Sequence, residues 1–234
     1  MLNSRHTYQY SQSVLATPSM LAQVAATSPQ PQLEARAVHL WRGEKHLLRG
    51  VSFALYSGEL LQVVGPNGVG KTSLLRCVAG LLPTESGEIV WQGQQLPDGR
   101  DEFHRELAYL AHVNGLKSDL TALENLRFGV SVRRAVTTEE LRETLQLLRV
   151  ESCADLPVRA LSAGQKRRVA LARIMLTRAA LWILDEPITN LDKAGIELFE
   201  ARIAEHMRAG GMILTAAHQL LLQGQPGVRT LELR

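Results

Sequence analysis

The sequence predicts an α/β domain in which short strands alternate with helices around a parallel sheet. The chain has 234 residues, of which 45% are hydrophobic and 21% are charged, the balance of a globular protein with a sizeable core. Residues 60–64 are apolar and pass directly into a glycine-rich turn and then a helical pattern. Residues 181–184 form a second apolar run that ends in two acids, which is typical of a buried parallel strand.

The remaining elements are predicted from hydrophobic spacing and turn residues. Strands are expected, in chain order, at residues 60–64, 88–91, 107–110, 181–184 and 212–215. Helices are expected at residues 73–79, 162–178 and around 196–207, with further helices in the middle of the chain. Two of these are expected to start at Thr121 and Thr137, because a glutamate follows each threonine at the capping-box spacing. The order of elements predicts an α/β core with a helical insertion at about residues 95–165.

The first 32 residues differ from the rest in composition. They are rich in serine, glutamine, alanine and proline, and they lack the charged start, compact apolar core and cleavage site of a secretory signal. We expect residues 1–32 to be a disordered extension, or to result from a start codon read too far upstream with Met20 as the true beginning. Residues 33–234 are expected to form the folded domain.

Charge, hydropathy and cysteine content exclude several classes of protein. The formal net charge of +3 is too small to indicate nucleic-acid binding. No uninterrupted apolar run reaches about 18 residues, so we do not expect the chain to span a membrane by itself. The two cysteines, Cys77 and Cys153, lack a metal-binding or redox spacing and are expected to be buried free thiols.

The turn after residues 60–64 carries the phosphate-loop pattern G-x-x-x-x-G-K-[ST] without a gap. Its residues are Gly65, Pro66, Asn67, Gly68, Val69, Gly70, Lys71 and Thr72. The glycines let successive backbone N–H groups point into one concavity, and the following helix adds its positive dipole end. Lys71 is then placed to neutralise the β and γ phosphates, and the Thr72 hydroxyl to coordinate Mg²⁺. The loop predicts binding of a nucleoside triphosphate, and a chance glycine-rich turn is the alternative.

Two carboxylates follow the apolar run at residues 181–184. Asp185 at the end of such a strand can reach a Mg²⁺ ion bound at the phosphate loop. Glu186 is then free to act as a base or to orient the attacking water. The alternative is a solvated strand end followed by a turn at Pro187.

A second helix start also suits phosphate binding. It consists of Leu161, Ser162, Ala163, Gly164 and Gln165. Ser162 and Gln165 have the capping-box spacing, so the plain interpretation is a capped helix whose basic residues face solvent, namely Lys166, Arg167, Arg168 and Arg173. A small, glycine-containing helix start also exposes amides that a phosphate can approach. The segment resembles the ABC signature L-S-G-G-Q, with Ala163 in place of its first glycine.

With both segments in view, the chain from Leu33 onward resembles an ABC-transporter nucleotide-binding domain. The resemblance implies a P-loop NTPase fold with a RecA-like core, a small antiparallel β subdomain and a helical signature subdomain. It implies a homodimer that holds two ATP molecules with Mg²⁺, each between one copy's phosphate loop and the other's signature segment. It further implies catalytic roles for Glu186 and His218, with His218 as the switch histidine that contacts the γ phosphate. Asp192 would belong to the D-loop, which crosses the dimer interface.

Two positions depart from the general ABC pattern. His112 stands where these domains usually carry the glutamine of the Q-loop. The aromatic residue that stacks on adenine is expected near residue 42, which leaves Trp41, one step aside, with Arg42 as the alternative.

The resemblance extends to a narrower family, the ATP-binding subunits of the cytochrome c maturation system (CcmA). Three segments are similar to that family: residues 115–126 together with His112, residues 161–172, and residues 181–187. The resemblance implies an ATP hydrolase and ABC-type translocase for haem export or haem-chaperone release. It implies integral membrane partners, CcmB with CcmC and CcmD, no nucleic acid, and a peripheral position at the cytoplasmic face of the bacterial inner membrane. The residues alone do not indicate haem, since the sequence has no C-x-x-C-H.

Three alternatives stay open. The first is an ABC ATPase subunit for another cargo, such as a lipid, drug or metal complex. The second is a soluble ABC ATPase that acts on ribosomes or DNA, although such proteins usually carry two nucleotide domains or a long coiled-coil insertion. The third is a P-loop kinase or GTPase, which would leave residues 162–165 and His218 without a role.

Overall fold

The computed structural model describes residues 30–96 and 100–234, which form two β-sheets and the helices around them. Most of the extension expected at residues 1–32 lies outside the described residues. The larger sheet is parallel and has the order β6 (Leu107–Leu110), β7 (Leu181–Asp185), β8 (Met212–Ala216), β3 (Leu60–Val64) and β9 (Val228–Glu232). The smaller sheet is antiparallel and has the order β2 (Lys45–Leu55), β1 (Leu33–Arg42), β4 (Ser86–Trp91) and β5 (Gln94–Gln95).

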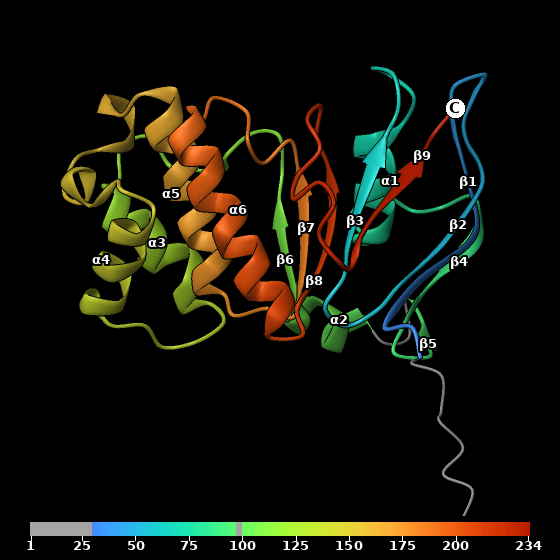
Figure 1. Ribbon diagram of the computed structural model, residues 1–234, viewed down its shortest axis with the longest axis horizontal. Coiled ribbons are helices and arrows are strands. Elements are labelled where there is room, and N and C mark those ends of the chain that lie inside the picture. The colour runs from blue at the N-terminus through green and yellow to red at the C-terminus, as the bar shows by residue number, and fades with distance from the viewer. Residues whose placement is uncertain (1–29, 97–99) are drawn as a thin grey trace, which may run out of the picture.

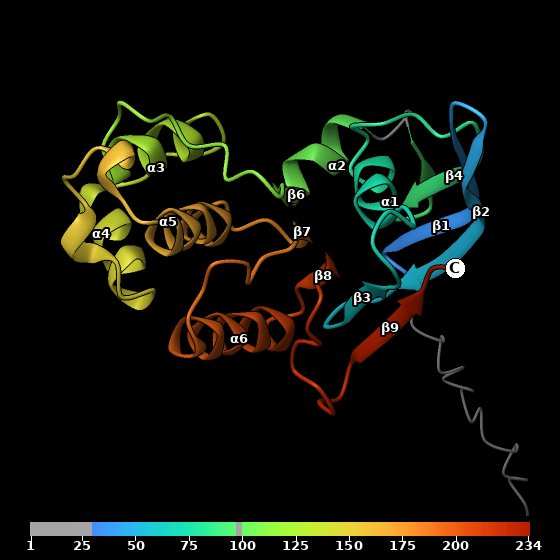
Figure 2. The same cartoon turned by 90° about the horizontal axis from the view of Figure 1, so that it is seen from above.

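The helices separate into two groups. The bounds are α1 (Lys71–Val78), α2 (Arg100–Glu106), α3 (Ala122–Ser131), α4 (Thr138–Leu147), α5 (Ala163–Leu176) and α6 (Lys193–Arg208), with short 3₁₀ turns at Glu151–Cys153 and Val158–Ala160. Helices α3, α4 and α5 gather at one end of the molecule, and the antiparallel sheet lies at the other (Figures 1 and 2). The parallel sheet lies between them. None of the helices in the described part of the chain has both the length and the apolar character of a membrane span.

The inner strands β7, β8 and β3 are mostly apolar because both of their faces are buried, whereas the edge strand β9 is largely exposed. In β7, Leu181 and Ile183 join a cluster that includes α1 and the antiparallel sheet. Trp182 and Leu184, which point to the other face, join a cluster formed with α3, α4, α5 and α6. Successive strand residues alternate between faces, so the core lies on both sides of the sheet. Because the strands are parallel, the carboxyl ends of β7 and β3 lie at the same edge of the sheet, separated by the single strand β8.

Two expectations about the helical region need correction. The capping box at Thr121 is complete, but at Thr137 only half of it forms: the threonine hydroxyl accepts from the Glu140 amide. The Glu140 carboxylate bonds to Arg134 and Arg178 instead, and these charged donors outcompete a backbone amide. The strand at residues 107–110, inside the range 95–165, pairs with β7 in the parallel sheet, so the purely helical part begins after it.

Candidate nucleotide site

The phosphate loop joins β3 to α1, and three glycines give it its shape. Gly65, Gly68 and Gly70 have φ angles of 143°, 75° and 116°, in the left-handed region that favours glycine. A Cβ at Gly65 would lie 2.5 Å from the carbonyl oxygen of Leu233, so the loop also passes close to the chain end. The turn predicted from the pattern therefore has the backbone conformation that a phosphate cradle requires.

Lys71 and Thr72 open α1 directly behind the loop. The Lys71 ammonium donates to the carbonyl oxygens of Gly65 at 2.7 Å and Pro66 at 3.1 Å, which keeps the charge over the loop. The Thr72 hydroxyl donates to Asp185 Oδ1 at 3.0 Å, which joins the start of α1 to the end of β7.

The donor set at this junction suits a magnesium ion. Asp185 is only 1% exposed, and its second carboxylate oxygen, Oδ2, is buried without a hydrogen-bond partner. A buried carboxylate oxygen with no partner is costly, and a hard cation held by hydroxyl and carboxylate oxygens would satisfy it. Thr72 and Asp185 thus lie together as the sequence predicts for a Mg²⁺ site.

Glu186 follows Asp185 and is held beside His218. Its φ angle is 50°, an uncommon value for a non-glycine residue, and its amide donates to the Ala216 carbonyl at 2.7 Å. Its carboxylate accepts from the His218 amide at 3.3 Å, and the His218 ring nitrogen Nε2 lies 3.5 Å from Oε1. The two predicted catalytic residues are therefore adjacent, although they are far apart in the sequence.

Lys71, Thr72, Glu186 and His218 line one pocket of about 420 Å³, and Asp185 lies behind Thr72 without lining it. Its walls are formed by Arg42, Leu47, Asn67, Gly68, Gly70, Lys71, Thr72, Ser73, His112, Glu186 and His218. His112, the predicted Q-loop position, is part of this wall. Trp41 is not part of it: its ring stacks on His46 with centroids 4.1 Å apart. Of the two side chains considered for adenine stacking, only Arg42 faces the pocket, because neighbouring residues of a strand point to opposite sides.

The signature segment lies away from this pocket. Ser162 caps α5 in a complete capping box with Gln165, as predicted. A Cβ at Gly164 would lie 2.8 Å from the Asn190 carbonyl oxygen, so this glycine permits α5 to approach the loop before α6. No residue of the segment lines the phosphate-loop pocket. Helices α5 and α1 are separated by β6 and β7 in both views (Figures 1 and 2).

Asp192, the predicted D-loop residue, caps α6. Its Oδ1 accepts from the Gly195 amide at 2.9 Å and forms an ion pair with Arg168 at 2.5 Å. The amide hydrogen bond, and then Arg168, lower the pKa of this carboxyl. The exposed side chain and the α5 arginine together fix the loop that precedes α6.

The basic residues of α5 do not face solvent, which corrects the plain interpretation of that helix. Arg167 is 2% exposed, and Lys166, Arg168 and Arg173 are partly buried. Arg173 donates to the carbonyl oxygens of Asn114 and Gly115, both at 2.9 Å. The sequence assigned no role to Arg167 or Arg173. The signature motif covers only the first turn of α5, and helical spacing alone does not show what these two side chains contact.

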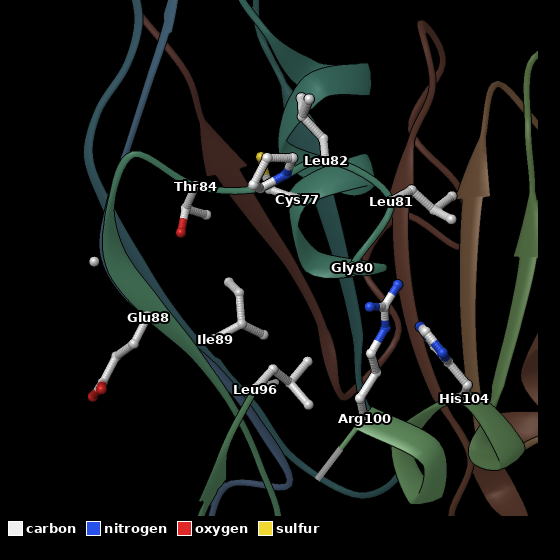
Figure 3. A pocket seen from close by; sticks show the side chains of 12 residues that line it. Cys77, Gly80, Leu81, Leu82, Thr84, Glu88, Ile89, Leu96, Arg100 and His104 are labelled. Carbon is white, nitrogen blue, oxygen red and sulfur yellow. The ribbon is translucent and has the colours of Figure 1, made fainter. Parts of the chain in front are cut away.

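A second cavity, of about 500 Å³, lies outside the phosphate-loop site. Figure 3 shows Arg100 and His104 extending from α2 toward Gly80, with Ile89 and Leu96 on the other wall. Cys77 borders it, and burial raises the pKa of this thiol to about 11, so it stays protonated and unreactive. Both cysteines are buried and free, as predicted. The cavity shares no residue with the phosphate-loop pocket and is not a candidate for the nucleotide.

The fold and the site together define an ATP-binding cassette. The family model described as ABC transporter matches residues 48–189, and the chain belongs to this family, which confirms the predicted α/β fold and the resemblance.

The curated relatives narrow the family further. The cytochrome c biogenesis ATP-binding export protein CcmA of Vibrio cholerae serotype O1 is 43% identical over 202 residues, 86% of this chain and 98% of that protein. CcmA of Escherichia coli strain K12 is 45% identical over 201 residues, 86% of this chain and 96% of that protein. Among solved structures, a putative ABC transporter ATP-binding protein from Pyrococcus furiosus superposes with a TM-score of 0.74 at 24% identity, covering 86% of this chain and 96% of that one. The last likeness supports the fold alone.

Proposed function

We propose that this chain is the ATP-hydrolysing subunit of a membrane complex for cytochrome c biogenesis, and that its work is haem export or haem-chaperone release. The observation that carries the proposal is identity of 43–45% along nearly the whole length of two curated CcmA proteins. The family supports ATP binding and hydrolysis independently of the cargo.

The residues of the pocket divide the work of hydrolysis. The loop amides and Lys71 bind the β and γ phosphates, and Thr72 and Asp185 hold Mg²⁺, which would supply charge neutralisation at the phosphates when bound. Glu186 accepts a proton from the attacking water as the water oxygen bonds to the γ phosphorus and the bond to the β-phosphate oxygen breaks. His218, whose Nε2 lies 3.5 Å from Glu186 Oε1, is proposed to orient that carboxylate. Its contact with the γ phosphate is part of the same proposal and follows from the resemblance to ABC domains.

The signature segment is proposed to serve the nucleotide of a second copy. Residues 162–165 do not line the chain's own pocket, yet they present a glycine-containing helix start of the kind that binds phosphate. A homodimer in which Ser162, Ala163, Gly164 and Gln165 approach the partner's ATP gives this segment a ligand. Asp192, which forms an ion pair with Arg168 of helix α5, would lie at that interface.

A membrane subunit is the other proposed partner. The segment 112–121 begins at the pocket residue His112 and ends where α3 begins. A change in its conformation on ATP binding can therefore be transmitted to a partner that contacts it. Val113 in this segment is 75% exposed, and the Lys117 ammonium lies 4.8 Å from the exposed Phe128 ring of α3. We propose that these exposed side chains contact CcmB, with CcmC and CcmD, at the cytoplasmic face of the inner membrane. An ABC subunit for another cargo is the second candidate.

The ATPase roles are tested with two substitutions. Glu186→Gln should retain ATP binding and lower kcat by about 100-fold or more, because the proton acceptor is lost, and it should accumulate as a dimer with ATP. Lys71→Ala should instead weaken ATP binding by about tenfold or more, because a phosphate ligand is lost. A Glu186→Gln protein that turns over normally would exclude the base assignment, and unchanged ATP affinity in Lys71→Ala would exclude the phosphate-loop assignment.

The cargo is tested by affinity purification of the tagged chain from its native membrane. Recovery of a small multi-pass subunit with other cytochrome c maturation proteins supports the proposal, and haem transport by that complex is then measured directly. Recovery of an unrelated permease would leave the ATPase assignment intact and exclude haem as the cargo.

A further inference from the structure

Arg167, in the second turn of α5, is buried and forms hydrogen bonds within the protein through all three nitrogens of its guanidinium group. A guanidinium carries five N–H donors. Nε donates to the Pro187 carbonyl at 2.9 Å, and Nη2 donates to the carbonyls of Asp185 at 2.8 Å and Glu186 at 2.6 Å. Nη1 donates to the Ala111 carbonyl at 3.2 Å and to Asn114 Oδ1 at 2.8 Å. The group therefore has five acceptors for its five donors.

The five acceptors belong to two segments that both carry pocket residues. Three are the consecutive carbonyls of residues 185–187, at the turn after β7 that bears Glu186. The other two are at positions 111 and 114, on either side of His112. Arg167 itself lies two residues after Gln165, in the helix that the signature segment begins. One buried side chain thus joins α5, the β7 turn and the His112 segment.

The contact to the β7 turn bears on the orientation of Glu186. This residue has a φ angle of 50°, which a side-chain-bearing residue keeps only where its surroundings hold it. Its amide is held by the Ala216 carbonyl, and its carbonyl is held by Arg167. The peptide groups on both sides of the Glu186 Cα are therefore fixed, and with them the direction of its carboxylate.

The charge on Arg167 also belongs to this arrangement. Burial lowers the pKa of its guanidinium to about 10, and the nearby charges of Asp185 and Glu186 raise it in part, so the group is cationic at neutral pH. A buried cation beside two carboxylates offsets their repulsion. Lysine would carry the same charge but has three donors at one point, which cannot reach five acceptors on two segments.

We propose that Arg167 is a positioning residue for ATP hydrolysis, which holds the backbone of Glu186 in its reactive conformation and links it to the segment around His112. This inference rests on the proposed role of Glu186. Arg167 does not line the pocket, so it acts through Glu186 and not on the nucleotide itself.

The test compares Arg167→Lys with Arg173→Lys in the full chain. Arg173 is the matched control because it lies on the same helix, is also desolvated, and donates to the carbonyls of residues 114 and 115 without contacting residues 185–187. With rates normalised to the folded fraction, Arg167→Lys should lower kcat by about tenfold or more and leave KM for ATP within about threefold. Arg173→Lys should leave both within about threefold, whatever its loss of stability. Equal effects of the two substitutions on kcat would overturn the proposal.

A double mutant separates positioning from general structural support. If Arg167 acts through Glu186, then Arg167→Lys should not further lower the residual single-turnover rate of Glu186→Gln, because coupled residues are non-additive. A further decrease of about tenfold in that background would overturn the proposal. An inactive Glu186→Gln with a fully active Arg167→Lys would reject the inference alone, whereas an active Glu186→Gln would reject the role of Glu186.

A second variant keeps the test valid if Arg167→Lys folds poorly. Asn114→Ala removes one acceptor of Arg167 and leaves α5 and residues 185–187 unchanged. Since it releases one of the five hydrogen bonds, kcat should fall by about threefold with KM unchanged. Wild-type kcat in this variant would show that the link to the His112 segment does not position Glu186.

Discussion

Asp185 offers a direct test of the magnesium site, because its carboxylate is buried and only half satisfied. Asp185→Asn keeps the size of the side chain and the acceptor for the Thr72 hydroxyl, but removes the negative charge and replaces Oδ2 with an amide. We expect the variant to fold and to lose the stabilisation that Mg²⁺ adds to bound ATP.

Two opposing terms set the stability of the free variant. The wild-type protein bears the cost of a carboxylate that is 1% exposed and accepts a single side-chain hydrogen bond, and the substitution removes that cost. The new amide is a buried donor without a partner, which costs about 1–3 kcal/mol. Because these terms offset each other, the free energy of unfolding should change by no more than about 2 kcal/mol.

The ligand supplies a larger effect in the wild type. A ligand at 100 times its Kd stabilises the folded state by about 2.7 kcal/mol. At about 2–4 °C per kcal/mol for a domain of this size, Mg·ATP should raise Tm by about 5–11 °C. Asp185→Asn loses a metal ligand, so adding Mg²⁺ to ATP should change its Tm by less than about 2 °C.

Thermal unfolding in ATP with EDTA and in ATP with Mg²⁺ measures this difference. Glu186→Gln is the control, since it makes the same acid-to-amide change at the next residue, which is not assigned to the metal. It should retain the Mg²⁺-dependent increase in Tm. A Mg²⁺-dependent increase in Asp185→Asn equal to that of the wild type would refute the assignment of Asp185.

Two further predictions concern packing and pH. Gly164→Ala should lower the free energy of unfolding, measured by urea titration, by about 1–3 kcal/mol, because the new Cβ would lie 2.8 Å from the Asn190 carbonyl oxygen. Ala163→Gly, at the exposed neighbouring position, should lower it by less than about 1 kcal/mol. Equal losses in the two variants would contradict the steric argument. Burial lowers the pKa of His206 below its ordinary value of 6.5, so the unfolded chain binds the proton first and stability decreases as pH falls through that value. His206→Phe should flatten this part of the stability curve, measured by urea unfolding from pH 5 to 8, and an unchanged slope would contradict it.

The sequence predicted the elements that bear the phosphate site because each has a strong local signal. The strand at residues 60–64 and the glycines after it are found where expected, and so is the strand that ends at Asp185. Apolar runs buried on both faces and glycines with left-handed φ angles depend little on distant residues. These positions could therefore be read from their immediate neighbours.

Of the longer antiparallel strands, β4 was predicted as residues 88–91, whereas β1 and β2 gave no such signal. In β1 the pairing with β2 shifts register at several points and Ala37 has a φ angle of 48°, so burial does not alternate regularly along the strand. Bulges of this kind break the period of two on which a strand prediction depends. The same irregularity bears on Trp41, since a shift of one residue decides which of two neighbouring side chains faces the pocket.

Arg167 shows a different limit of sequence reasoning. Its type and position on a helix favour an exposed charge, since arginine is rarely buried without partners. Its partners are backbone carbonyls of residues 111 and 185–187 and one asparagine side chain, and backbone carbonyls are the same in every sequence. A sequence motif identifies side chains that contact the ligand. Arg167 instead contacts the backbone of two segments that carry such side chains, the one with His112 and the one with Glu186. Only the packing of α5 against the ends of β6 and β7 brings those carbonyls to one point, so the structure was needed to connect the signature helix with Glu186.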